Sequence, residues 1–285
     1  MSFNKTTRII EGVAYPYEYR TPVELPIGAT LVDLYTTAGT LTALTWLMPQ
    51  EFMDHSGFLV AGTLFTHEIP KDFMGASQIL TRFDRNLEAN TLNYLTTKVC
   101  PIKGEVDAIR QVVNNLQNEH LKRFTLLVLS NPTVYTLFWT SKVYGNKPCD
   151  CGSLPAYSRK MADHVSQMAF AQPTDKEYAM VYALLHGIGR IWCNRENEFE
   201  QLPEHLDPET VGYDVLFKAL VRLSDASPDD AEALDWLFSG RWRKGGPGFL
   251  AEIGALVDGL SEELAKPFIT PSHRGHPNWR PIVVE

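Results

Sequence analysis

Two histidines and an aspartate in the second half of the chain lie beside apolar stripes of helical spacing. His164 lies in KMADHVSQMA, and His186 ends the apolar stretch in YALLHGIGRIW, where two glycines follow it. Asp258 lies in IGALVDGLSEEL, where an acid can turn inward and then needs a partner. Imidazole nitrogens and carboxylate oxygens are common ligands of divalent metals. The alternative is simple packing, since a histidine beside an apolar face is more often a packed residue than a ligand.

The elements that would position these residues are helices. Apolar residues recur at three- and four-residue intervals over 105–130 and again from 156 onward. Asn131-Pro132 is expected to end the first helix, and a new one is expected over 133–142. The stretch 145–155, rich in Gly, Pro, Cys and Asp, predicts a loop. We therefore expect a helical domain over 104–266 and an extended tail over 267–285, which contains four prolines.

The first part of the chain has a different pattern, typical of strands. A hairpin is predicted within 30–49, with further strands over 57–69 and 77–84 and another around 7–13. Several short strands with glycine turns favour a small barrel or sandwich over 1–103, with an OB-like barrel as the specific expectation. The predicted fold class is α+β.

Three segments around the histidines and the aspartate resemble the HD-domain metal-dependent phosphohydrolases. ALLHGIGRI resembles the signature helix of that family, DHVSQMA the preceding helix and LVDGLSEEL the late helix. The spacing also agrees, with 22 residues from His164 to His186 and 72 from there to Asp258. The resemblance implies that these three residues are metal ligands. It also implies that Arg190 supplies the catalytic positive charge for which the family often uses Lys.

The sequence departs from the HD pattern at the residue after His186. The family has Asp there, which bridges the metals and orients water, whereas this chain has Gly187. The later His-His pair of the family would fall in FSGRWRKGG, where Gly240 and Arg241 stand instead. Because hydrolysis needs a fixed cation and an activated water, we expect a degenerate site. It would hold no cofactor, or one weakly bound divalent metal (Mn, Mg, Fe or Zn).

A β-rich domain ahead of an HD segment resembles the OB-fold–HD exoribonucleases, and the HD segment is also similar to that of conjugative-element relaxases. This resemblance implies contact with single-stranded nucleic acid. Trp46 and Phe58 are candidates for stacking on bases, with barrel core as the alternative. The basic candidates are Arg241, Arg243 and Lys244, with a solvated turn as the alternative.

Composition limits the function classes. The net charge of −8 and pI near 5.5 exclude bulk attraction to nucleic acid or anionic membrane. We found no signal peptide or membrane-spanning run, so the protein is expected to be cytoplasmic, without a membrane partner. The expected function is a non-catalytic nucleic-acid- or protein-binding OB–HD protein. The alternative is an active metal-dependent phosphohydrolase or 3′-5′ exonuclease with a reduced ligand set, and a third possibility is a helical core that only packs.

Overall fold

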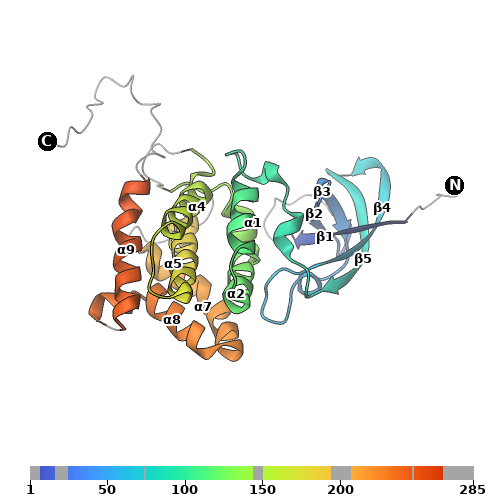
Figure 1. The fold of residues 1–285 in the computed structure, drawn as a ribbon. Helices are drawn as coiled ribbons and strands as arrows, with labels where there is room; N and C mark the ends of the chain where they lie inside the picture. The colour runs from blue at the N-terminus through green and yellow to red at the C-terminus, as the bar shows by residue number, and fades with distance from the viewer. Residues whose placement is uncertain are drawn as a thin grey trace, which may run out of the picture. The chain divides into compact units, whose positions relative to one another are not determined.

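The chain divides into two compact units. The structure is a computed structural model, and it describes residues 7–16, 25–73, 75–143, 150–193, 207–245 and 247–265. One unit contains residues 1–99 together with 126–136, and the other contains 100–125 together with 137–285. Figure 1 draws the strands of the first unit in blue to cyan and the helices in green to red. The predicted α+β class is confirmed, and the predicted tail over 267–285 lies outside the described residues.

Five strands form the first unit, and their pairing closes a barrel. They are β1 (Thr7–Pro16), β2 (Thr30–Thr36), β3 (Gly39–Thr45), β4 (Ala61–Phe73) and β5 (Ala76–Asn86). Around the barrel their order is β1-β2-β3-β5-β4, with β4 returning to pair with β1 and with β3 parallel to β5. Strands β4-β1-β2-β3 therefore follow Greek-key order. Each predicted strand is present, with shifted bounds.

The barrel interior is filled by alternate residues of the strands. Its buried core consists of Ala14, Val32, Leu34, Ala43, Leu64 and Leu80, together with Phe52 from the short helix η1 (Pro49–Phe52). Gly12 and Gly62 face each other across β1 and β4. A Cβ at Gly12 would lie 2.4 Å from the Tyr35 oxygen, and one at Gly62 would lie 2.2 Å from the Asp84 oxygen. The close approach of strands in this small barrel therefore requires glycine at both positions.

The segment 126–136 packs on the barrel strands of its own unit. It includes the end of α2 (Glu119–Leu129) and most of α3 (Pro132–Leu137). The buried Tyr135 ring meets Tyr35 of β2 edge to face, with centroids 5.3 Å apart. The Leu59 amide donates to the Ser130 carbonyl oxygen at 2.9 Å. Part of the predicted helical domain therefore belongs structurally to the β unit.

Helices form the second unit. They are α1 (Glu105–Asn114), the first part of α2, α4 (Ser153–Ser166), α5 (Pro173–Leu185), α6 (Arg190–Cys193), α7 (Pro208–Ala226), α8 (Pro228–Phe238), η4 (Arg241–Lys244) and α9 (Gly248–Ala265). The single helix predicted over 105–130 is wrong, because the chain breaks between α1 and α2. Asn118 stabilises the break, since its side-chain oxygen accepts from the amides of His120 and Leu121. The loop predicted over 145–155 is also too long, because α4 begins at Ser153.

A buried carboxylate links three helices of this unit. Asp230, in the first turn of α8, is 5 % exposed. It accepts from the Tyr178 hydroxyl of α5 at 2.6 Å, and from the Ser227 hydroxyl at 2.7 Å. The Asn118 amide ahead of α2 donates to both carboxylate oxygens, at 3.1 and 3.2 Å. These bonds fix the ends of α2 and α8 against α5. Among the described helices, none has the length and hydropathy needed to cross a membrane.

Candidate functional site

The C-terminal end of α5 and the N-terminal end of α7 meet at a turn that requires glycine. His186 is the C-terminal cap residue of α5, and Gly187, Ile188 and Gly189 form the turn that follows it. A Cβ at Gly189 would lie 1.8 Å from the Pro208 carbonyl oxygen at the start of α7. Only glycine allows this approach. The turn therefore brings His186 next to the first residues of α7.

Three potential metal ligands gather at this turn. They are His186, Glu209 in the first turn of α7, and Asp258 of α9. One ligand atom from each lies within 4.8 Å of the other two. Both ring nitrogens of His186 are buried, and neither has a hydrogen-bond partner among the described residues. The two carboxylates are partly exposed, with 33 % of the Glu209 side chain and 47 % of Asp258 accessible.

An arginine already engages both carboxylates. Arg243 of η4 donates to the two Glu209 oxygens at 2.6 and 2.9 Å, and to Asp258 at 3.3 Å. Its position follows from Gly254 of α9, where a Cβ would lie 2.2 Å from the Trp242 indole. Because Trp242 packs there, the next residue reaches Asp258 one turn further along α9. The Arg243 guanidinium thus binds the Glu209 carboxylate through two hydrogen bonds, which is the strong, bidentate form of an arginine–carboxylate pair.

The surroundings of the site keep the His186 imidazole neutral and the Arg243 guanidinium charged. Burial lowers the pKa of His186 to about 4; the charge of Arg190 lowers it too, whereas that of Glu209 opposes the shift. The hydrogen bonds with Glu209 raise the pKa of Arg243 above its ordinary value. At neutral pH the imidazole of this group is therefore neutral and its guanidinium is charged.

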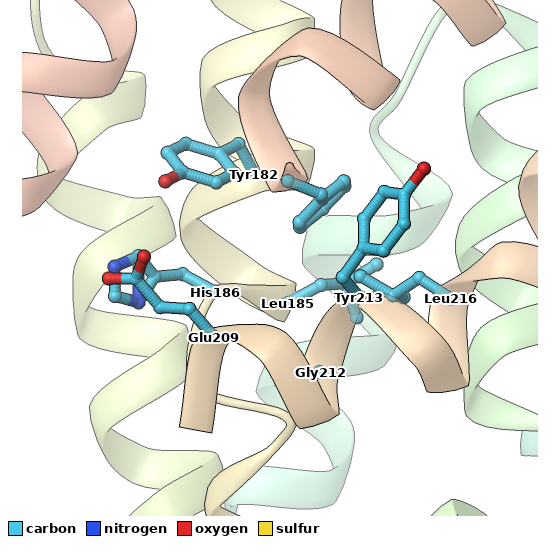
Figure 2. A pocket seen from close by; sticks show the side chains of 8 residues that line it. Tyr182, Leu185, His186, Glu209, Gly212, Tyr213 and Leu216 are labelled. Atoms are coloured by element: carbon cyan, nitrogen blue, oxygen red, sulfur yellow. The ribbon is translucent and has the colours of Figure 1, made fainter. Parts of the chain in front are cut away.

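A small pocket opens beside His186, as Figure 2 shows. In this view the imidazole lies next to the Glu209 carboxylate, Tyr182 lies above them, and Tyr213 lies farther to the right beside Leu216. The walls of the pocket come from α5, α7 and α8 and consist of Tyr182, Leu185, His186, Glu209, Gly212, Tyr213, Leu216 and Phe238. The Tyr182 ring packs edge to face against His186 and against Phe238, with centroids 5.5 and 5.2 Å apart. The pocket therefore combines aromatic walls with a carboxylate and an imidazole.

The residues predicted from the HD resemblance are only partly brought together. His186 and Asp258 lie in one group, but the group does not include His164, whose side chain is exposed in the last turn of α4. The buried side of α4 points elsewhere, as its buried neighbours Met161 and Val165 show. His164 lies roughly 90° around the helix from the centre of that side, at 100° per residue.

Gly187 and Arg190, the two other residues compared with the HD family, both lie against side chains of α4. A Cβ at Gly187 would lie 3.1 Å from the Leu154 side chain and 3.4 Å from the Tyr157 ring. Arg190 donates to the Val143 carbonyl at 2.9 Å and lies over the Tyr157 ring, 5.7 Å from its centroid. The arginine predicted to be catalytic thus has packing and hydrogen-bonding contacts of its own.

The residues predicted to contact nucleic acid differ in their exposure and in their partners. Phe58 is 1 % exposed, so its prediction as a stacking residue is wrong; the ring belongs to the core. Trp46 at the end of β3 is 50 % exposed, and its indole nitrogen donates to the Ile27 carbonyl at 3.3 Å. Arg241 forms an ion pair with Asp235, Arg243 is engaged as described, and Lys244 is exposed.

Sequence reasoning missed Glu209 and the role of Arg243. Glu209 follows an aspartate cap and a proline that begin α7, which signals a helix start but no ligand. The sequence indicates Arg243 only as part of a basic cluster with Arg241 and Lys244. No protein-family model and no curated protein matches this chain.

Proposed function

We propose that this protein is a non-catalytic module that binds a protein partner, and that its helical unit is a degenerate HD-type domain in which Arg243 replaces the metal. The observation that carries the proposal is the set of hydrogen bonds from Arg243 to Glu209 and Asp258. A guanidinium supplies positive charge to both carboxylates, but it cannot polarise a bound water as a metal does. The site keeps its scaffold without hydrolytic chemistry.

The position of Gly187 supports the same proposal. A Cβ at this residue would lie 3.1 Å from Leu154, 3.4 Å from Tyr157 and 3.6 Å from the Arg190 side chain. The position that the metal-bridging Asp of an HD pair would take is therefore surrounded by packed side chains, and a carboxylate introduced there would have to be buried beside Arg190.

A protein partner fits the surface charge better than nucleic acid. Binding to a phosphate backbone needs free cations, and Arg241 and Arg243 are engaged by carboxylates. On the barrel, Arg8 pairs with Glu68 and Arg82 pairs with Asp84. The net charge of −8 also disfavours binding to nucleic acid.

The barrel itself supports an OB-like assignment without its usual ligand surface. A closed five-stranded Greek-key barrel is the OB architecture, in which β2 and β3 bind oligonucleotides. Here the Tyr35 ring of β2 is covered by Tyr135, and Asp33 accepts a hydrogen bond from Thr42 of β3. Leu31 and Leu44 are part of a small apolar cluster. We propose that this surface has become internal packing.

A metal-dependent hydrolase is the second candidate, and one observation favours it. His186 has two buried ring nitrogens without a partner among the described residues, beside two carboxylates. Two carboxylates and an imidazole fit the donor set of a three-ligand zinc site. A metal held by His186, Glu209 and Asp258 would supply an activated water. For this, Arg243 would have to release the Glu209 oxygens that it now occupies.

Metal titration of paired variants separates the two candidates. We expect the natural protein to bind Zn²⁺ or Mn²⁺ only weakly by calorimetry, and Arg243→Ala to bind at least about tenfold more tightly, because two carboxylates lose their counter-charge. Arg241→Ala is the matched control, since it breaks a neighbouring ion pair with Asp235 outside the group. Micromolar metal binding by the natural protein that His186→Ala abolishes, together with hydrolysis of bis(4-nitrophenyl) phosphate, would overturn the proposal.

A further inference from the structure

Two cysteines from distant parts of the sequence lie near each other in the helical unit. Cys100 is the first residue of this unit, and Cys151 lies just before α4. The Cys100 sulfur is so close to Gly152 that a Cβ added to that glycine would lie only 3.1 Å from it. Because the Cα atoms of consecutive residues are about 3.8 Å apart, the buried sulfur lies about one residue away from Cys151. Neither cysteine forms a disulfide.

Backbone hydrogen bonds fix the turn that carries Cys151. The Ser153 amide donates to the Asp150 carbonyl oxygen at 3.1 Å, so Cys151 and Gly152 are the two central residues of the turn. Gly152 has a φ of 79° and a ψ of 6°, which is the conformation of the third residue in a type II turn. Its amide also donates to the Thr140 carbonyl oxygen at 3.1 Å. The turn is therefore held in place beside the buried sulfur, and its glycine leaves room for that sulfur.

The two thiols differ in their surroundings. Cys100 is 4 % exposed, whereas Cys151 is exposed to solvent. Burial raises the pKa of the Cys100 thiol, and a backbone hydrogen bond with Ile102 opposes this only in part. Since oxidants react with accessible thiolates, we expect Cys151 to react first and Cys100 to react second. The exposed Cys151 side chain can rotate towards Cys100 without displacing a packed neighbour.

The geometry points to Cys100 and Cys151 as a redox-sensitive pair that a hydroperoxide converts into a disulfide. The Cys151 sulfur first attacks the peroxide, whose O–O bond breaks. This step gives a sulfenic acid, and the released alcohol (water, if the oxidant is hydrogen peroxide) takes up the thiol proton. The Cys100 sulfur then attacks the sulfenic sulfur, so that the S–S bond forms, the S–O bond breaks and water leaves with the Cys100 proton. The two sulfurs together lose the two electrons that reduce the peroxide.

The disulfide would connect the start of the helical unit to the turn ahead of α4. Because it closes the long stretch of chain between the two residues, it would restrict the unfolded chain and so stabilise the oxidised protein. This property goes beyond the proposed partner binding, since neither cysteine belongs to the group formed by His186, Glu209 and Asp258.

Peptide mapping of the natural protein tests the pair. The folded protein is treated with hydrogen peroxide, its remaining thiols are blocked with N-ethylmaleimide, and it is digested without reductant. We expect one crosslinked peptide that joins Cys100 to Cys151, the loss of two free thiols per chain, and recovery of both thiols with dithiothreitol. Cys149 lies two residues before Cys151 in the sequence and is the competing thiol. A crosslink through Cys149 in place of Cys151, or one that forms only in urea, would overturn the inference.

Three variants establish the order of the two steps. Cys100→Ser should lose the crosslink and retain a sulfenic acid at Cys151 that dimedone labels, whereas Cys151→Ser should leave the buried Cys100 as a thiol. Cys193→Ser of α6 is the matched control and should form the crosslink as the natural protein does. Thermal melts confirm that each variant is folded. Dimedone labelling of Cys100 in Cys151→Ser, without labelling of Cys151 in Cys100→Ser, would contradict the assigned order.

Discussion

The buried carboxylate of Asp230 offers the sharpest test of how the helical unit is held together. Its neighbour Asp229 is an exposed carboxylate in the same turn of α8, so Asp230→Asn and Asp229→Asn form a matched pair. Burial raises the pKa of Asp230, but hydrogen bonds from Tyr178, Ser227 and Asn118 outweigh this effect and lower the pKa below its ordinary value. The ionised form is therefore the one that stabilises the fold.

The magnitude follows from the three donors to Asp230. A hydrogen bond to a charged group is stronger than a neutral one by about 1 kcal/mol, which gives about 3 kcal/mol for three bonds. The lower cost of burying a neutral amide offsets part of this, so we expect Asp230→Asn to lower the free energy of unfolding by about 2 kcal/mol. The exposed Asp229→Asn should change it by less than about 0.5 kcal/mol.

Urea unfolding followed by circular dichroism at neutral pH measures both variants. Because the folded pKa of Asp230 is depressed, its contribution is present above the unfolded pKa near 3.8 and is lost as pH falls through the lower folded value. The natural protein should therefore lose more stability than Asp230→Asn below about pH 4. If the two asparagine variants differ by less than about 0.5 kcal/mol at pH 7, the network does not stabilise the unit as argued.

Three further predictions concern the site and the barrel. Because burial lowers the pKa of His186 to about 4 from 6.5, the unfolded chain binds a proton in that window that the folded protein does not. Stability should be full above pH 6.5 and fall by about 3 kcal/mol towards pH 4; an unchanged pH profile in His186→Gln would contradict this. Gly187→Asp should lower the free energy of unfolding by about 3 kcal/mol, since its Cβ meets Leu154 at 3.1 Å. It should not gain phosphodiesterase activity with added manganese, and a stable, active variant would refute the geometry. Phe58→Ala should cost about 3–5 kcal/mol and Trp46→Ala less than about 1 kcal/mol in urea unfolding, because only the first ring is fully buried; equal costs would argue against the assigned burial.

The sequence by itself determined the elements of the fold. Period-two patterning indicated the strands, and three- and four-residue spacing indicated the helices, because these patterns follow from local backbone geometry. The break between α1 and α2 was missed, since it depends on an asparagine cap within a continuous apolar pattern. Local sequence patterns also could not predict that the strands close into a barrel. It depends on β1 pairing with β4 and β3 with β5, which are contacts between distant segments.

At the site, the resemblance to HD domains pointed to His186 and Asp258, which lie in one group. Only the tertiary structure added Glu209 and Arg243 and left His164 outside, because these outcomes depend on which helix faces meet. Gly189 against the start of α7 positions Glu209, and Gly254 against Trp242 positions Arg243. A glycine in a sequence indicates a position where the backbone has more conformational freedom. Which neighbouring atom occupies the space of the absent Cβ is known only once the chain is folded.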